Sequence, residues 1–396
     1  MSASPFGVGA AFFIVECTSD DSVHSTKRMR ILQVIDSLQL GGAEVLLRDL
    51  ALRWQKSGLE VDIAVLRTTG SPLEQELSQA GIRVFPTGGG EIYSLSQVRA
   101  LAKLLPGYDL IQVHLFPAQL WVAMAAKLAR TKAPLVTTEH STLNSRRQKR
   151  SFHAVDRWMF RQYRKVICIS EATANVLREW VPETARNLQV IPNGVDAARF
   201  REATPACKKD VVGCDAPVVV NVGRFEPQKN HTCLLRAMMR VPDAHLVLIG
   251  EGPLRPEAED LARKLGIAER VHFLGRRADV PQLLKMADLY VQPSRFEGFG
   301  LAALEAMAAG IPVVASTVPG LASVVAGAGV LVPAGNEKRL AAEINSILRS
   351  PERREQLCRA GGRRAQEFTI ERTADLYASA YRAVLGYDAK LEKQSC

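Results

Sequence analysis

Residues 288–316, DLYVQPSRFEGFGLAALEAMAAGIPVVAS, constrain the fold more than any other stretch of the chain. A short apolar run at 289–291 is followed by a glycine-containing loop, an alanine-rich run at 301–309, a Gly-Ile-Pro stop and a second apolar run at 313–315. Glycine and proline end regular elements, and runs of these lengths suit a strand, a helix and a second strand. The stretch therefore predicts a β-strand–α-helix–β-strand unit within a parallel sheet.

The loop of this unit combines an anion site with two carboxylates. A helix N-terminus offers free backbone N–H groups and the positive end of the helix dipole, which suit phosphate. Glu297 lies in the loop and Glu305 about one turn into the helix. A carboxylate repels phosphate but accepts hydrogen bonds from sugar hydroxyls. The combination indicates a nucleotide-sugar site, whereas a packed crossover helix with a solvated loop would explain the loop alone equally well.

Short apolar runs alternate with helical patterns along most of the chain. The predicted strands are at 30–35, 61–66, 82–85, 110–113, 135–138, 166–169, 188–191, 217–222, 245–249 and 271–274. The clearest helices are at 43–56, 117–129, 172–180, 337–348, 352–366 and 371–385. This alternation predicts doubly wound parallel sheets, whose ligands bind beyond the carboxyl ends of the strands. The 396 residues suffice for two domains of ordinary size.

Two further turns carry groups that bind anions. Gly41 and Gly42 follow the first strand and present backbone N–H groups at the start of a helix. Arg224 follows a later strand, and Lys229 comes five residues after it. A guanidinium fork and an ammonium group both suit a diphosphate. Each turn taken alone is also typical of an ordinary strand–helix connection.

The composition favours a cytoplasmic enzyme without a bound metal. No apolar run approaches the ~20 residues of a membrane-spanning helix, and the run at 6–15 lacks the basic start of a signal peptide. The seven cysteines form no C-x-x-C pair, which predicts free thiols in a reducing compartment.

The net charge of +10 suits nucleic acid, phosphate-bearing substrates or an anionic membrane. Basic and aromatic residues gather at 144–165, which we call the basic segment. It predicts either a solvated basic face over a packed apolar stripe or a surface for anionic lipid or a pyrophosphate-linked acceptor. No base-stacking platform or recognition motif supports nucleic-acid binding.

Six motifs together resemble the family-4 retaining glycosyltransferases. Residues 297–305, E-G-F-G-L-x-x-x-E, match the E-x7-E signature of that family. The others are GGAE at 41–44, IPNGVD at 191–196, GRFEPQKN at 223–230, GEGP at 250–253 and FLG at 273–275. The resemblance covers roughly residues 30–385. It implies an α/β GT-B fold, in which two Rossmann-like doubly wound domains face an interdomain cleft.

The resemblance also implies a domain organisation. The expected parts are an extension at 1–28, an N-terminal acceptor-side domain at 29–205 plus 370–396, and a C-terminal nucleotide-sugar-binding domain at 206–369. Met29 directly precedes the first strand and is a candidate natural start. Residues 201–216 have the composition of a linker, and the last helix would cross back to the first domain at Thr369.

Residue roles follow from the same resemblance. His114 in DLIQVH matches the family's sugar-contacting histidine, with Gln112 at the place of a first histidine, and His140 at the next strand end is a second candidate. The expected catalytic residues are His114, Arg224, Lys229 and Glu297. The expected donor-binding residues are Gly41, Gly42, Arg224, Lys229, Gly275, Arg276, Glu297, Gly298, Phe299, Gly300, Leu301 and Glu305. Glu297 would hold sugar hydroxyls and Glu305 the ribose.

The expected activity is metal-independent, retaining transfer of a sugar from a nucleotide-sugar donor to an acceptor hydroxyl. The chain contains no D-x-D pair, so Arg224, Lys229 and the helix N-terminus would stabilise the leaving diphosphate. No cofactor besides the donor is expected. At 318–325, PGLAS replaces the family's G-G-x-x-E, and a loop with altered donor contacts is expected.

The expected acceptor is a saccharide or lipid-linked molecule of cell-surface polysaccharide or glycolipid synthesis, met at the inner face of the membrane. A nucleotide-sugar epimerase on the same fold is the alternative enzyme. It would use a carboxylate base near the sugar and would need no acceptor surface.

Overall fold

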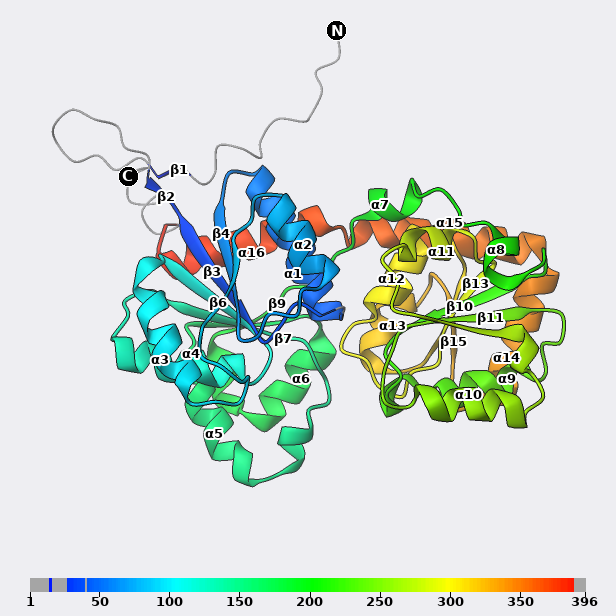
Figure 1. Ribbon diagram of the computed structural model, residues 1–396, viewed down its shortest axis with the longest axis horizontal. Coiled ribbons are helices and arrows are strands. Elements are labelled where there is room, and N and C mark those ends of the chain that lie inside the picture. Colours follow the sequence, from blue (N-terminus) through cyan, green and yellow to red (C-terminus); the bar gives the residue numbers. More distant parts are fainter. Residues whose placement is uncertain (1–13, 16–26, 40, 388–396) are drawn as a thin grey trace, which may run out of the picture.

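The computed structural model describes residues 14–15, 27–39 and 41–387 (Figure 1). The predicted extension at 1–28 lies outside these ranges except for β1 (Ile14–Val15) and β2 (Lys27–Arg28), which pair antiparallel. The rest of the described chain forms two α/β units side by side along the long axis.

The first unit is a seven-stranded parallel sheet in the order β5-β4-β3-β6-β7-β8-β9. Its strands are β3 (Arg30–Ile35), β4 (Glu60–Val65), β5 (Val84–Pro86), β6 (Leu110–His114), β7 (Leu135–Glu139), β8 (Lys165–Cys168) and β9 (Leu188–Val190). Its helices are α1 (Gly42–Lys56), α2 (Pro72–Gln79), α3 (Ser96–Leu104), α4 (Ala118–Ala129), α5 (Ser151–Phe160) and α6 (Glu171–Trp180), with short 3-10 turns η1 (Leu105–Gly107), η2 (Ser145–Gln148) and η3 (Pro182–Arg186).

The second unit is a six-stranded parallel sheet in the order β12-β11-β10-β13-β14-β15. Its strands are β10 (Val218–Val222), β11 (His245–Ile249), β12 (Val271–Gly275), β13 (Leu289–Gln292), β14 (Val313–Ser316) and β15 (Val330–Val332). Its helices are α7 (Ala197–Arg201), α8 (Lys208–Val212), α9 (His231–Met238), α10 (Arg255–Lys264), α11 (Val280–Lys285), α12 (Leu301–Ala308), α13 (Pro319–Val325), α14 (Glu337–Arg349) and α15 (Pro351–Glu367), with η4 (Pro227–Lys229) and η5 (Ala268–Arg270).

Both sheets have the doubly wound topology that the strand–helix alternation predicts. The strand order reverses between β3 and β6 and again between β10 and β13. Ligands of such sheets bind beyond the carboxyl ends of the strands, at these switch points. The unit predicted from 288–316 is confirmed as β13, α12 and β14, with the two strands parallel and adjacent.

The chain crosses twice between the units at one place. The long helix α15 packs against α12, and α16 (Ile370–Leu385) packs on α1 of the first unit (Figure 1). Thr369, the predicted crossover, caps α16 and pairs with Val195 of the outgoing segment. A Cβ on Gly194 would lie 2.3 Å from the carbonyl oxygen of Thr369, so only glycine allows the two crossing segments this close.

Three segments differ from their sequence prediction. Residues 319–325, predicted as a loop, form α13. The predicted linker at 201–216 contains the helix α8. The short helix α7, placed by the sequence in the first domain, packs against α11 and α12 of the second unit.

The basic segment at 144–165 is partly packed into the protein. Phe160 and Tyr163 are buried in the core, which confirms the packed apolar stripe. Arg146 forms a buried ion pair with Asp156 at 2.8 Å, and Arg147 pairs with Glu139 at 2.5 Å. Two of its cations are therefore structural and are not offered to a partner.

Candidate functional site

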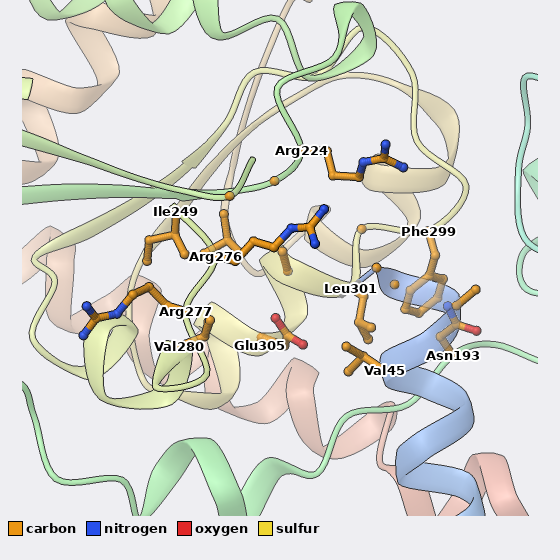
Figure 2. Close-up of a pocket in the computed structure, with 18 of the residues that line it drawn as sticks. Val45, Asn193, Arg224, Ile249, Arg276, Arg277, Val280, Phe299, Leu301 and Glu305 are labelled. Carbon is orange, nitrogen blue, oxygen red and sulfur yellow. The ribbon is translucent and has the colours of Figure 1, made fainter. Parts of the chain in front are cut away.

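A cavity of about 390 Å³ lies between the two units, beyond the carboxyl ends of strands from both sheets (Figure 2). The predicted site residues that line it are Gly41, Gly42, Arg224, Lys229, Arg276, Glu297, Gly298, Phe299, Gly300, Leu301 and Glu305. Gly275 does not line it. As the last residue of β12 it has a φ of 67°, and it turns the chain so that Arg276 and Arg277 reach the cavity. The site thus gathers residues from both units at one cleft.

The first turn of α12 forms one wall. Gly300 adopts a φ of 106°, in the left-handed region that favours glycine, and no side chain caps the helix. The first turn contains no acidic residue, so its positive end faces the cavity without a built-in counter-charge. An anion such as a diphosphate fits this position.

Glu297 is held by three donors on one oxygen. Its Oε1 accepts hydrogen bonds from Lys229 Nζ at 2.7 Å, Gln292 Nε2 at 2.6 Å and Ser294 Oγ at 2.7 Å. No hydrogen bond from the described residues reaches Oε2. The carboxylate is therefore fixed in orientation, and Oε2 remains able to accept a hydroxyl group of a ligand.

Cations surround the same space. Figure 2 shows Arg224 and Arg276 on the second unit's side, with Val45 and Asn193 of the first unit across the cavity. The Arg224 side chain is 60% exposed and pairs with Glu226 at 3.0 Å. Across the cleft, burial raises the pKa of Glu44 to about 7, and Arg224 opposes that rise. Arg224 is thus positioned to exchange a carboxylate partner for a phosphate.

Glu305 has an unusual protonation equilibrium. Its carboxyl borders the cavity near Leu301, close to the centre of the view in Figure 2. Burial raises its pKa to about 8, and Asp49 of α1 adds to the effect, while Arg48 and Arg199 oppose it. A carboxyl group that is largely protonated at neutral pH can both donate and accept a hydrogen bond, which suits a pair of ribose hydroxyls.

The two strand-end histidines have different positions from those the sequence predicts. His140 lines the cavity. His114, the expected catalytic histidine, is 1% exposed and does not line it. Its Nδ1 lies 3.0 Å from His140 Nε2, so His114 stands behind His140. The structure thus places His140 at the cavity wall, and His114, the expected catalytic histidine, lies behind it.

The loop of Glu297 touches the first unit directly. Ser170 Oγ donates to the Gly298 carbonyl at 2.6 Å, and Thr142 Oγ1 donates to the Glu297 carbonyl at 3.3 Å. A Cβ on Gly298 would lie 2.4 Å from the His140 carbonyl oxygen. The glycine is required by this close approach, which brings the carboxylate loop of one unit against the histidine of the other.

Several residues that line the cavity were not predicted from the sequence. Arg48, Asn193 and Arg199 come from the first sheet's α1 and from the crossing segment. Asn193 carried a signal, since Asn-Gly marks a turn after a strand. Arg48 and Arg199 carried none, because only the packing of α1 and α7 beside α12 brings them to the cavity.

The described residues contain no group of three or more His, Cys, Asp or Glu side chains arranged to hold a metal. Two Rossmann-like units, with an anion-binding helix start and a fixed carboxylate in the cleft between them, define the class of GT-B glycosyltransferases.

Comparison with known proteins places the chain within that class. The family model described as "Glycosyl transferases group 1" matches residues 208–364, and the model described as "Glycosyltransferase Family 4" matches residues 40–199. The chain belongs to the family-4 glycosyltransferases, and it is a glycosyltransferase.

Named relatives agree with this assignment. The 2-deoxystreptamine glucosyltransferase of Streptomyces kanamyceticus is 30% identical over 349 residues, covering 81% of this chain and 89% of that protein. The D-inositol 3-phosphate glycosyltransferase of Segniliparus rotundus is 37% identical over 235 residues, which span 56% of this chain and 52% of that protein. The crystal structure of Anabaena HepE with UDP and glucose has a TM-score of 0.78 at 26% identity, covering 89% of this chain and 99% of that one.

Proposed function

We propose that this enzyme transfers a hexose from a uridine-diphosphate sugar to an acceptor hydroxyl with retention of the anomeric configuration. The observation that carries the proposal is the fixed Glu297 carboxylate beside the uncapped start of α12. A sugar esterified to a diphosphate carries its hydroxyl groups next to the negative charge of the phosphates, and this wall offers hydrogen-bond donors next to a hydroxyl acceptor. The UDP bound to HepE, a protein of the same fold, supports a uridine nucleotide.

In the proposed transfer, the role of each side chain follows from its charge. The N–H groups of α12 and the cations Arg224 and Lys229 stabilise the negative charge that develops on the leaving diphosphate. Glu297 holds sugar hydroxyls rather than attacking the sugar, because three donors fix its Oε1 and leave Oε2 oriented to accept a hydroxyl group. Glu305 holds the ribose, and His140 contacts the sugar from the first unit.

Retention is the stereochemistry that the E-x7-E signature indicates. With Glu297 occupied as a hydroxyl acceptor, the acceptor alcohol attacks from the face that the diphosphate leaves. The new C–O bond forms as the C1–O bond to phosphate breaks, and the alcohol's proton passes to the departing phosphate oxygen. The anomeric coupling constant of the product, read by NMR, reports the stereochemistry directly.

Glu297→Ala is the decisive variant for the proposal. We expect transfer to be lost while the fold is retained, with Ser294→Ala, which removes one of three donors, keeping most of the activity. The assay follows UDP release and product formation with a panel of UDP-sugars, and circular dichroism checks the fold. Full activity in Glu297→Ala would overturn the role of the carboxylate. Accumulation of an epimerised donor without acceptor would instead favour the epimerase.

The proposed acceptor is a saccharide or lipid-linked molecule of cell-surface polysaccharide or glycolipid synthesis, reached at an anionic membrane surface. None of the described helices is both long and apolar enough to cross a bilayer. On the neighbouring helices α4 and α5, Leu128 and Trp158 are 60% and 40% exposed, and the exposed cations Arg130, Lys149 and Arg150 flank the ends of the same two helices. Apolar side chains among cations are typical of contact with anionic lipid.

Vesicle sedimentation tests this surface. The protein should bind vesicles with an anionic lipid and not neutral vesicles, and Trp158→Ala together with Lys149→Ala should weaken that binding. Equal binding to both vesicle types, or none to either, would contradict the proposal.

A further inference from the structure

Four side chains form a continuous hydrogen-bonded series behind the cavity wall. His140 Nε2 lies 3.0 Å from His114 Nδ1, and His114 Nε2 lies 2.9 Å from Gln33 Oε1. Gln33 Nε2 donates in turn to the hydroxyl of Tyr381 at 3.3 Å. The series runs from the cavity to helix α16, and only His140 lines the cavity.

The fold explains why polar groups meet at this depth. Gln33 and His114 lie on the sheet face that packs under α1 and α16, where the apolar neighbours on the same face are Ile31, Ile35 and Leu110. Both polar side chains are almost fully buried. A buried polar group costs free energy unless it is hydrogen-bonded, so the series is constrained to satisfy its own donors and acceptors.

The chemistry of the groups determines the protonation of each ring nitrogen. Gln33 Oε1 can only accept, so His114 Nε2 must carry a hydrogen. A neutral imidazole has a single N–H group, so His114 Nδ1 is an acceptor. His140 must then donate from Nε2, which leaves a lone pair on its Nδ1. That atom forms no hydrogen bond with the described residues, and it is not one of their buried unpaired atoms.

We propose that His114 and Gln33 are positioning residues that hold His140 in the Nε2–H tautomer, so that His140 Nδ1 accepts a hydrogen bond from a ligand hydroxyl. This rests on the proposed function for the identity of the ligand as a sugar. His140 acts as an oriented acceptor on the first unit's side of the cleft. His114 never touches the ligand and acts through the tautomer of its neighbour.

The charge state is consistent with this arrangement. Burial lowers the pKa of His140 to about 4, and burial together with His140 lowers the pKa of His114 well below its usual range. Both rings are neutral at pH 7. A protonated His140 would present an N–H to the cavity and would lose the acceptor.

Nitrogen NMR of histidine-labelled enzyme reads the tautomer directly, because protonated and unprotonated ring nitrogens have well-separated ¹⁵N shifts. We expect an unprotonated Nδ1 and a protonated Nε2 for His140, with peaks assigned by their loss in His140→Asn. This measurement needs no substrate. It therefore separates failure of this inference from failure of the proposed transfer.

Two substitutions of His114 distinguish positioning from packing. Asparagine keeps an acceptor close to the place of Nδ1, whereas phenylalanine keeps the ring volume and removes both nitrogens. We expect kcat of His114→Phe to fall by about tenfold to a hundredfold, as for a lost hydrogen bond in the transition state. His114→Asn should stay within about threefold of wild type. A purely packing role predicts the reverse order.

The two tyrosines of α16 provide a matched pair. Tyr381 bonds Gln33, whereas the equally buried Tyr377 bonds Thr138 at 3.0 Å outside the series. Tyr381→Phe should shift the His140 tautomer equilibrium and lower kcat, and Tyr377→Phe should change neither. A protonated His140 Nδ1 in wild type, or wild-type turnover in His114→Phe, would overturn the inference. Thermal unfolding of each variant identifies any that fail to fold.

Discussion

Glu305→Gln tests whether ionisation of the buried Glu305 carboxyl destabilises the folded enzyme in the absence of donor. Glutamine has the shape of the protonated carboxyl and never ionises. In the folded enzyme burial raises the pKa of Glu305 from 4.5 to about 8. Below pH 4.5 the carboxyl is protonated in both the folded and the unfolded chain, so wild type and variant should respond to pH alike. As pH rises from 4.5 towards 8, the unfolded chain ionises this carboxyl while the folded chain keeps it protonated, so stability that was present at low pH is lost until the group is ionised in both states.

The magnitude follows from the same pKa values. Each pKa unit corresponds to about 1.4 kcal/mol, so a rise from 4.5 to about 8 costs about 5 kcal/mol once the group is ionised in both states. About 4 kcal/mol of this falls between pH 5 and pH 9. The carboxyl borders the cavity, where water solvates part of its charge. We therefore expect wild type to lose about 2 to 4 kcal/mol relative to the variant over this range.

Urea denaturation of both proteins at pH 5, 7 and 9, followed by tryptophan fluorescence, measures the difference. Asp36, whose pKa is also raised, is present in both proteins, and its contribution largely cancels. Glu257→Gln removes an exposed carboxylate on α10 and serves as a control for the loss of a surface charge. A constant difference for Glu305→Gln would refute the reasoning, and so would a variant that becomes relatively less stable as pH rises.

Three further variants test separate contacts. Asp156→Asn leaves the buried Arg146 without its counter-charge and should cost about 3 to 5 kcal/mol, seen as a lower thermal unfolding midpoint; an unchanged midpoint would contradict a structural pair. Gly298→Ala places a Cβ 2.4 Å from the His140 carbonyl oxygen and should lower kcat/KM by at least about tenfold by separating loop and histidine, so wild-type kinetics would argue against that contact. Arg224→Ala should weaken UDP binding by about tenfold and flatten its salt dependence, as calorimetry at two ionic strengths would reveal; an unchanged salt slope would remove Arg224 from the diphosphate site.

The fold was largely predictable because the signals were local. Runs such as the one that forms β13 are buried on both faces and therefore uniformly apolar, and each is bounded by glycine or proline. Parallel sheets in turn determine where ligands bind, since the loops after the strands meet at one edge. Arg224, Glu297 and Glu305, which follow such strands in the sequence, line a single cavity.

The structure differs from the sequence prediction where a tertiary contact, and not the local pattern, requires a particular residue type. Pro319 and Gly320 resemble a loop, yet proline is well suited to the first turn of a helix, and α13 begins there. Gly320 is required because a Cβ would lie 2.2 Å from the Glu297 carbonyl oxygen. Similarly, Arg146 and Arg147 make the composition of their segment basic, but their carboxylate partners lie on α5 and β7. A buried ion pair between separate elements cannot be predicted from a local sequence pattern.

The two histidines show that a position at the end of a strand does not determine whether a side chain reaches the cavity. His114 and His140 both belong to the ligand edge of the sheet, and the family resemblance favours His114 over His140. His114 is the last residue of β6, so the alternation of the strand turns its side chain, like that of Gln112, under α16. His140 lies one residue beyond β7 and is free of that alternation. The histidine within the strand is buried under α16 and the histidine just past the strand lines the cavity, so the position relative to the strand's last residue separates the two.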